Sequence, residues 1–349
     1  MGSCRVLLLA LLAVGVACGA QGQLVPALII FGDSVTDAGN NNNLLTLVRA
    51  NFPPYGRDFV NHAPTGRFCN GKLATDITAE YLGFDSYPPP YLSKEAKGKS
   101  LLTGVNFASG ASGYHRTTPF LYGAISLNLQ LEYYKEYQSK VAKIAGKSNA
   151  TSIFSGAIHI LSAGSSDFLQ NYYINPLLFS IYTADKFSDI LIESFYSFIQ
   201  SLYGLGARRI GVTSLPPMGC LPASITLFGG SSNECVHRLN NDAILFNTKM
   251  NMAAQVLQKR FPDLKLVVFD IYNPLLDFIN HPADNGFAEV RRACCGTGTI
   301  ETSLLCNSRS IGTCSNASAY LFWDSFHPSE AANQLLADHL LEQGIPLIS

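Results

Sequence analysis

The segment Ile29-Ile30-Phe31-Gly32-Asp33-Ser34 places three apolar residues directly before a glycine, an aspartate and a serine. A short apolar run that ends in a turn residue is typical of a buried strand. Ser34 then follows the carboxyl end of the predicted strand, where open α/β sheets bind their ligands. We therefore expect Ser34 to be a nucleophile at the edge of a parallel sheet.

Strand-like and helix-like patterns alternate along the rest of the chain. Strands are predicted at Ala27–Phe31, Gly104–Phe107, Ala157–Ser162, Arg209–Thr213 and Leu264–Asp270. Helices are predicted at Lys72–Leu82, Leu127–Ala145, Ala184–Tyr203, Cys235–Arg260 and Glu330–Leu341. This alternation predicts a three-layer α/β/α fold with a central, mostly parallel five-stranded sheet. Residues 40–70 and 271–322 are irregular, and we interpret them as loop insertions of the kind that set specificity.

A general base for Ser34 is expected in Trp323-Asp324-Ser325-Phe326-His327-Pro328. Asp324 and His327 are three positions apart, so the carboxylate can fold back and accept a hydrogen bond from Nδ1 of the histidine. Nε2 is then free to take the serine proton. A catalytic triad is recognised by its geometry rather than by its chain order. The plainer alternative is a turn serine and a surface histidine that never meet.

The composition limits the classes of function. The chain has 349 residues, of which 47% are hydrophobic and 14% charged, and its formal net charge is −1. Such a chain can bury a sizeable core, and it has no basic patch for nucleic acid. Its seven histidines are scattered, and no His-x-His pair occurs among them, so we expect neither a metal nor another cofactor.

Residues 1–20 have the pattern of a signal peptide. Arg5 precedes an apolar run from Val6 to Val16, and Cys18-Gly19-Ala20 offers small residues for cleavage. The alternative, a membrane anchor, is disfavoured because the run is too short to span a bilayer comfortably. We expect residues 21–349 to form a single domain without an integral membrane segment. This domain would be secreted or held in the lumen of the secretory pathway.

Seven cysteines follow residue 20, and four of them crowd between residues 294 and 314. In an oxidising compartment such crowding indicates disulfides. A zinc site is the alternative, but the spacing lacks a C-x-x-C pair. The segments Asn149-Ala150-Thr151 and Asn316-Ala317-Ser318 are acceptors for N-glycans.

Six motifs occur in order along the chain. They are Phe31-Gly32-Asp33-Ser34-Val35-Thr36-Asp37, Pro64-Thr65-Gly66-Arg67-Phe68-Cys69-Asn70-Gly71, Asn106-Phe107-Ala108-Ser109-Gly110, Gly164-Ser165-Ser166-Asp167, Leu215-Pro216-Pro217-Met218-Gly219-Cys220-Leu221-Pro222 and Asp324-Ser325-Phe326-His327-Pro328. Together they resemble the GDSL esterase/lipase family, also called SGNH hydrolases, and in particular its large plant branch. One such motif is common by chance, whereas the whole set in this order is specific. The resemblance runs from Ala27 to Gln343.

The resemblance implies a flavodoxin-like SGNH hydrolase fold and ester hydrolysis through an acyl-enzyme. Ser34 would attack the acyl carbon, His327 would transfer the proton, and Asp324 would orient His327. The family's oxyanion hole has three donors. The first maps to Ser34 N–H, and the second maps to Gly110 N–H, or to Ala111 if the alignment shifts by one residue. The third is an asparagine in the family and is Ser166 here.

Ser166 is a departure from the family pattern. Its hydroxyl is shorter than an asparagine amide, and losing one oxyanion donor lowers kcat by about 10²–10³-fold. We therefore expect a slow esterase, or one whose substrate or loop supplies the missing donor. Loss of catalysis is the alternative. The neighbouring carboxylates of Asp33 and Asp37 are expected to accept backbone N–H bonds that hold the turn of the nucleophile.

The resemblance also bears on the cysteines. Cys69 stands where the plant branch usually carries serine, so we expect it to be the unpaired thiol. Cys220 and Cys235 are expected to form a bridge that closes the loop after the Pro-Pro turn. The other four cysteines are expected to form two bridges in which the adjacent Cys294 and Cys295 take different partners.

Two classes of function follow from these expectations. The first is a secreted carboxylester hydrolase that acts on lipid esters, cutin-like esters or acetylated cell-wall polysaccharide, with acyl transfer as a variant. The second is a protein that keeps the cleft but only binds a glycan or lipid there. The intact triad favours the first class, and Ser166 favours the second. A structural extracellular protein is disfavoured because the chain has no internal repeats.

Overall fold

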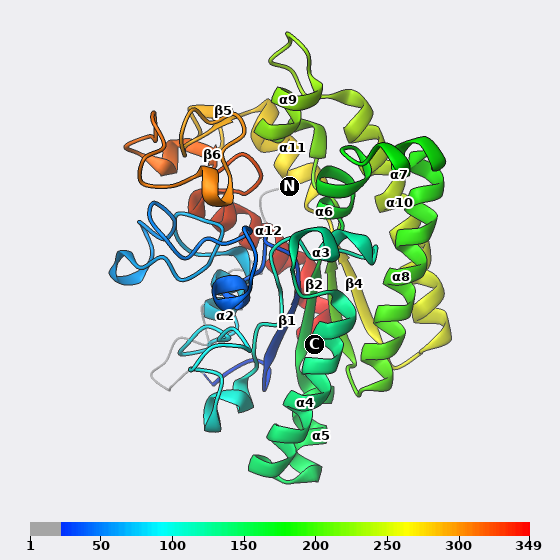
Figure 1. Ribbon diagram of the computed structural model, residues 1–349. Coiled ribbons are helices and arrows are strands. Elements are labelled where there is room, and N and C mark those ends of the chain that lie inside the picture. Colours follow the sequence, from blue (N-terminus) through cyan, green and yellow to red (C-terminus); the bar gives the residue numbers. More distant parts are fainter. Residues whose placement is uncertain (1–21) are drawn as a thin grey trace, which may run out of the picture.

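The computed structural model describes residues 22–349 (Figure 1). The expected signal peptide, residues 1–20, lies outside the described residues. The central sheet has four parallel strands in the order β1-β2-β3-β4. They are β1 (Leu28–Gly32), β2 (Ile158–Ser162), β3 (Arg209–Thr213) and β4 (Lys265–Phe269). These strands confirm four of the five predicted strands to within one or two residues.

The fifth predicted strand, Gly104–Phe107, is wrong, and the sheet has four strands rather than five. In this segment only Asn106 forms isolated bridges, one to Ile30 of β1 and one to Pro90. The Asn106 side chain donates to Thr36 O at 2.6 Å and accepts from Ala108 N at 2.9 Å. These bonds hold the chain in a turn beside β1, so the segment does not form a continuous strand paired with β1.

Helices cover both faces of the sheet, which confirms the three-layer architecture (Figure 1). One face is covered by α2 (Ala74–Tyr81) and α12 (Glu330–Ile348). The other is covered by helices that include α4 (Leu127–Ala145), α8 (Ala184–Gly204) and α10 (His237–Arg260). Successive residues of β1 point to opposite faces, so Ile30 packs with the α2 and α12 side and Phe31 with the α4 and α8 side.

Helix α4 connects the core to the end of β1. Its N-cap is Ser126, whose side chain accepts from Leu129 N at 3.2 Å. One turn further on, the buried Gln130 accepts from Gly32 N at 3.0 Å and donates to Gly32 O at 2.9 Å. Gln130 thus satisfies both backbone groups of the last residue of β1 and fixes the direction in which the chain leaves the sheet.

The insertion at 271–322 contains regular structure that the sequence did not predict. It holds α11 (Tyr272–Asn280) and β5 (Glu289–Ala293), and β5 pairs in parallel with β6 (Tyr320–Phe322). Helix α5 (Lys147–Gly156) and four further short helices complete the α-helices of the described chain. The four short helices are α3 (Thr117–Tyr122), α6 (Ser165–Asp167), α7 (Pro176–Ile181) and α9 (Pro222–Phe228).

Three disulfides confirm the predicted cysteine pattern. Cys220 pairs with Cys235. The adjacent Cys294 and Cys295 pair with Cys314 and Cys306, respectively. Cys69 is the free cysteine of the described chain, and it is buried.

Two kinds of feature are absent from residues 22–349. No group of three or more His, Cys, Asp and Glu side chains in this range is placed to hold a metal ion. None of the helices in the same range is long and apolar enough to cross a membrane.

Candidate active site

Ser34 lies on a sharp turn at the carboxyl end of β1. Gly32, the last residue of β1, has φ +136°, and a Cβ atom there would lie 2.0 Å from Ser162 O at the end of β2. Asp33 N donates to the same oxygen at 2.9 Å. A glycine is therefore required where the end of β1 approaches the end of β2 so closely. The turn that follows leaves Ser34 at the carboxyl edge of the sheet.

Ser34, His327 and Asp324 are joined by two short hydrogen bonds. His327 Nε2 lies 2.7 Å from Ser34 Oγ, and His327 Nδ1 lies 2.7 Å from Asp324 Oδ1. The three residues are 5%, 4% and 0% exposed, respectively. Because a carboxylate only accepts, Nδ1 carries the proton and Nε2 is free to accept the serine proton. The structure thus brings together the three residues that the sequence predicts.

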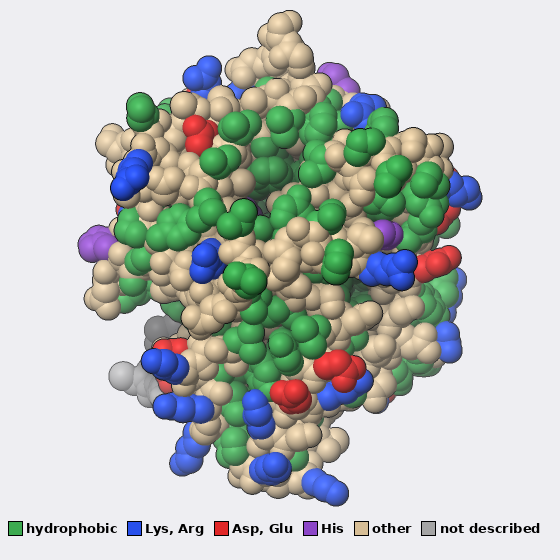
Figure 2. All heavy atoms as spheres, in the orientation of Figure 1, with side chains coloured by type: hydrophobic (Ala, Val, Ile, Leu, Met, Phe, Trp, Pro, Cys, Tyr) green, Lys and Arg blue, Asp and Glu red, His purple; other side chains and the backbone are tan. Residues whose placement is uncertain are grey.

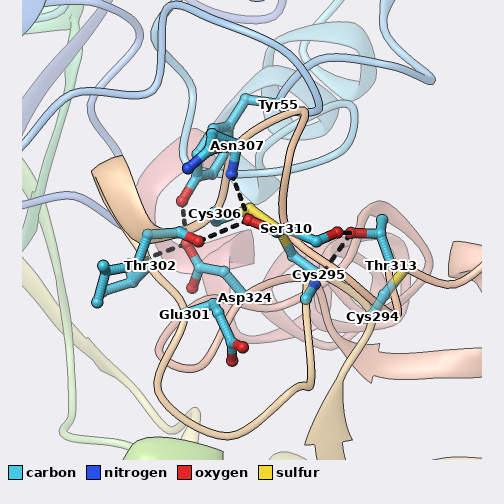
Figure 3. Close-up of a disulfide and its surroundings, with 12 residues drawn as sticks. Tyr55, Cys294, Cys295, Glu301, Thr302, Cys306, Asn307, Ser310, Thr313 and Asp324 are labelled. Carbon is cyan, nitrogen blue, oxygen red and sulfur yellow. Dashed lines mark hydrogen bonds between the residues drawn. A yellow bond between two sulfur atoms is a disulfide. The ribbon is translucent and has the colours of Figure 1, made fainter.

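The Asp324 carboxylate receives five donors. Oδ1 accepts from Phe326 N and His327 N at 2.9 Å each, in addition to His327 Nδ1. Oδ2 accepts from the Tyr55 hydroxyl at 2.6 Å and from Thr302 Oγ1 at 3.1 Å. Figure 3 shows Tyr55 and Thr302 approaching Asp324 from different loops. With both oxygens held, the carboxylate has a fixed orientation toward the histidine ring.

Tyr55 and Thr302 lie in the two insertions, and no sequence motif singles them out. The Tyr55 hydroxyl also accepts from Ser303 N at 2.8 Å. Burial and the neighbouring Asp324 raise the pKa of Tyr55 well above its usual value, so the phenol stays protonated and remains a donor. The loop that carries Thr302 and Ser303 is closed by the Cys295–Cys306 disulfide (Figure 3).

Asp33 and Asp37 hold the turn as expected. Asp33 Oδ1 accepts from Val35 N at 3.1 Å. Asp37 Oδ1 accepts from Gly39 N at 2.7 Å and from Asn40 N at 2.8 Å. Burial raises the pKa of Asp33 to about 7 and the pKa of Asp37 to about 6, and the backbone N–H groups oppose both shifts.

The resemblance suggests Gly110 N–H as the second oxyanion donor, and in the structure this N–H already donates a hydrogen bond. It donates to Asp37 Oδ2 at 2.9 Å. The next residue, Ala111, is fully buried with φ +65°, and its N–H donates to no residue within 22–349. A left-handed alanine is strained by roughly 1–2 kcal/mol, and such strain clusters at functional sites. Ser109 N donates to Gly32 O at 3.0 Å and so brings this turn beside the nucleophile.

Ser166 lies on α6, just beyond β2, and lines the same cavity as Ser34 and His327. Its hydroxyl makes no hydrogen bond to any described residue. The following Asp167 accepts from Tyr114 N at 2.7 Å and from Thr118 Oγ1 at 2.6 Å. Burial raises the pKa of Asp167 to about 7 against these donors. Asp167 therefore anchors α6 to the segment that carries Tyr114 and Thr118. The neighbouring Ser166 lines the cavity with its hydroxyl unbonded.

The cavity around Ser34 is largely apolar. Its apolar walls come from β6 and from loops and helices beyond the central sheet, and they include Leu169, Pro216, Leu221, Ile271, Leu275, Phe322 and Phe326. On the face of the molecule shown in Figure 2, hydrophobic side chains gather over the middle and upper part, and charged side chains lie mostly below and along the edges.

A serine, a histidine and a carboxylate joined in this way, at the carboxyl edge of a parallel sheet between two helical layers, are the arrangement found in serine hydrolases with an α/β fold. The sequence pattern of one family, described as GDSL-like Lipase/Acylhydrolase, matches residues 28–340. The chain belongs to this family.

Named relatives agree with the family match. GDSL esterase/lipase At5g03820 of Arabidopsis thaliana is 67% identical over 333 residues, which cover 95% of this chain and 94% of the relative. GDSL esterase/lipase At5g03810 of the same plant is 67% identical over 332 residues, covering 95% and 94%. GDSL esterase/lipase APG, also of A. thaliana, is 63% identical over 327 residues, covering 93% of each chain. The protein is therefore a carboxylic ester hydrolase of this family.

Proposed function

We propose that this protein is a secreted serine carboxylester hydrolase that acts on lipid-type esters through an acyl-enzyme at Ser34. The observation that carries the proposal is the continuous hydrogen-bonded chain from Ser34 through His327 to Asp324. Ser34 Oγ attacks the carbonyl carbon while His327 Nε2 takes its proton. His327 then donates that proton to the leaving alcohol, and Asp324 stabilises the imidazolium. Water, activated by the same base, hydrolyses the acyl-enzyme.

Three groups are proposed to stabilise the oxyanion. They are the N–H of Ser34, the N–H of Ala111 and the hydroxyl of Ser166. The strained backbone and the unengaged N–H of Ala111 support its assignment in place of Gly110. The unengaged Ser166 hydroxyl on the cavity wall supports a weak third donor, because a serine reaches less far than the family's asparagine.

Substitution of Ser166 by asparagine is expected to raise kcat on a small activated ester about 10-fold, since an amide donor is worth a few kcal/mol in the transition state. KM should change less, because the donor acts mainly on the transition state. Steady-state kinetics with p-nitrophenyl acetate measure both constants. Ser166→Ala is the matched control and should be mild. If Ser166→Asn does not raise kcat while Ser166→Ala abolishes activity, the serine is itself a competent donor.

Secretion is supported by the pattern of residues 1–20 and by the three disulfides in the chain that follows. Both glycosylation acceptors, Asn149 and Asn316, have exposed side chains, so each is accessible to an attached glycan. We propose that residues 21–349 fold as the single mature domain.

A lipid-type ester is favoured over an acetylated polysaccharide by the walls of the cavity. A sugar ring presents many hydroxyl groups, and each needs a partner when it is buried. The walls around Ser34 offer mostly apolar side chains. The complete hydrogen-bonded triad likewise favours catalysis over binding alone. Acyl transfer would use the same intermediate, with an alcohol in place of water.

Two measurements test this function. An organophosphonate ester probe should label the purified protein at Ser34 and fail to label Ser34→Ala. A release assay should then show turnover of p-nitrophenyl esters of longer acyl chains and little release of acetate from acetylated xylan. A natively folded protein that is not labelled, or that acts mainly on the xylan, would contradict the proposal.

A further inference from the structure

We propose that a second apolar cavity, which lies between the sheet and the helices α2 and α12, holds the acyl chain of the substrate. We call it the acyl slot. It is defined by residues that include Val35, Ile158, Ile160, Phe269, Leu336 and Gly344. This inference rests on the proposed acyl-enzyme at Ser34 and adds the class of substrate, an ester of an extended apolar carboxylic acid.

The acyl slot follows one face of the sheet along its whole length. Ile158, Ile160 and Ser162 are alternate residues of β2, and all three line the slot. Residues two apart on a strand share a face, and each residue adds about 3.3 Å. The slot therefore extends about 13 Å from Ser162, beside the nucleophile turn, to Ile158 at the far end of the strand.

The acyl slot adjoins the catalytic cavity. Five residues line both cavities: Val35, Ser162, Thr213, Ile271 and Leu336. Val35 directly follows the nucleophile in sequence. An acyl carbon bonded to Ser34 Oγ would therefore lie near the upper end of the slot, where the apolar side chains of Val35, Ile271 and Leu336 belong to both cavities.

The walls of the acyl slot match an uncharged aliphatic chain. None of its lining residues carries a charge. Several of its polar side chains are already engaged with the protein. Thr213 Oγ1 donates to Ser162 Oγ at 2.9 Å, Thr78 Oγ1 donates to Ala74 O at 2.8 Å, and the Asn333 amide donates to Lys72 O at 2.9 Å. Thr75 Oγ1 is the buried hydroxyl of the slot without a partner among the described residues. A polar or charged ligand would therefore find few partners to replace its hydration, whereas an aliphatic chain gains free energy with each methylene that it buries.

Small residues on α12 keep the acyl slot open. Ala337 and Gly344 are seven positions apart, so they lie on the same face of the helix, about 10 Å apart along its axis. A glycine inside a helix is destabilising by roughly 0.5–1 kcal/mol relative to alanine. No close neighbour requires glycine at 344, since an added Cβ would meet nothing nearer than the Phe269 ring at 3.5 Å.

We assign the slot to the acyl chain rather than to the alcohol, because the acyl group stays bonded to Ser34, next to Val35, after the alcohol has left. The Ser34 Oγ–acyl bond forms as the bond to the alcohol oxygen breaks, and the departing alkoxide takes the proton held by His327 Nε2. The alcohol then leaves through the catalytic cavity. The acyl chain stays in place until water cleaves the new ester bond and restores the Ser34 hydroxyl.

Substitutions at the two small residues of α12 should shorten the acyl slot by different amounts. Ala337→Leu, near Leu336, is expected to lower kcat/KM about 10-fold or more on p-nitrophenyl octanoate and dodecanoate. Gly344→Leu, at the far end of the slot, is expected to lower kcat/KM about 10-fold or more on p-nitrophenyl dodecanoate only. p-Nitrophenyl acetate should lose much less activity in both variants, because its acetyl group has no methylene to place in the slot, whereas each methylene that loses its contact costs about 4-fold.

Controls separate this inference from simpler effects. Glu342→Leu, an exposed change on the same helix, should leave the whole series unchanged. Melting temperatures show whether each variant is folded, and Gly344→Ala supplies a smaller change at the same position. A second series, the acetate esters of butanol, octanol and dodecanol, lengthens only the alcohol. Losses in that series instead of the first would assign the slot to the alcohol and overturn the inference.

A readout without turnover keeps the inference independent of catalysis. Calorimetry should detect dodecanoate binding to Ser34→Ala, and Gly344→Leu in that background should weaken it about 10-fold or more. If the folded variants bind dodecanoate and cleave all chain lengths like the wild type, the acyl slot is refuted while the esterase proposal stands. If Ser34 is not labelled by the phosphonate probe, the esterase proposal fails, and dodecanoate binding still decides whether the slot takes an acyl chain.

Discussion

Replacement of Ser34 or His327 by alanine is expected to lower kcat/KM by about 10⁴-fold or more. The physical reason is the 2.7 Å contact between His327 Nε2 and Ser34 Oγ, through which the proton must move. Because the two residues act in one step, the double variant should be little worse than either single variant. Kinetics on a p-nitrophenyl ester, with melting temperatures to confirm folding, measure all three effects.

His281 offers a matched control for this experiment. It forms an exposed pair with Asp277, with Nδ1 and Oδ1 2.8 Å apart, so it reproduces the histidine–aspartate contact away from the cavity. His281→Ala should leave kcat/KM unchanged. If the losses at Ser34 and His327 multiply in the double variant, the two residues do not belong to one mechanism.

Replacement of Tyr55 by phenylalanine is expected to lower kcat by about 10–100-fold with KM nearly unchanged. The change removes the 2.6 Å bond from the Tyr55 hydroxyl to Asp324 Oδ2, and it leaves Ser303 N without its acceptor. A buried hydrogen bond to a charged group contributes roughly 1.5–3 kcal/mol. The loss should appear in kcat because the carboxylate orients the histidine during proton transfer, whereas Tyr55 is not among the residues that line the cavity.

A double-mutant cycle distinguishes a positioning role from a merely structural one. In an Asp324→Ala background, Tyr55→Phe should have almost no further effect on kcat, because its target is gone. Tyr203→Phe is the matched control, since its hydroxyl also lies 2.6 Å from a carboxylate, Asp263, but on the surface. If Tyr55→Phe lowers kcat equally with and without Asp324, Tyr55 does not act through the aspartate.

The elements that the sequence predicted well have strong local signals. Helix α4 begins and ends at the predicted residues, because a serine N-cap precedes a long amphipathic run and Gly146 follows it. Strands β1 to β4 are short apolar runs between turns. Strand β5 was missed because its sequence, Glu289–Ala293, is mostly charged and lacks an apolar run. Its strand structure depends on pairing with the distant β6.

For the site, the residues close in sequence were predictable. His327 and Asp324 are three positions apart, so a single tight loop makes their contact, and Ser34 follows from the strand and glycine before it. Identifying Tyr55 and Thr302 was not possible from the chain alone. Their bonds to Asp324 span 269 and 22 residues and depend on how two irregular insertions fold over the sheet.

The same distinction holds for the oxyanion donor and the acyl slot. The sequence left Gly110 and Ala111 as alternatives. Only the fold shows that Gly110 N–H is engaged, because its acceptor, Asp37, lies 73 residues away in the chain. The acyl slot needs α2, the sheet and α12 to pack together, so no single segment contains it. Local patterns therefore identified Ser34, His327 and the layers of the fold, because these depend mainly on neighbouring residues. The orientation of the aspartate and the shape of the cavities arose only on folding, because they depend on contacts between segments far apart in the chain.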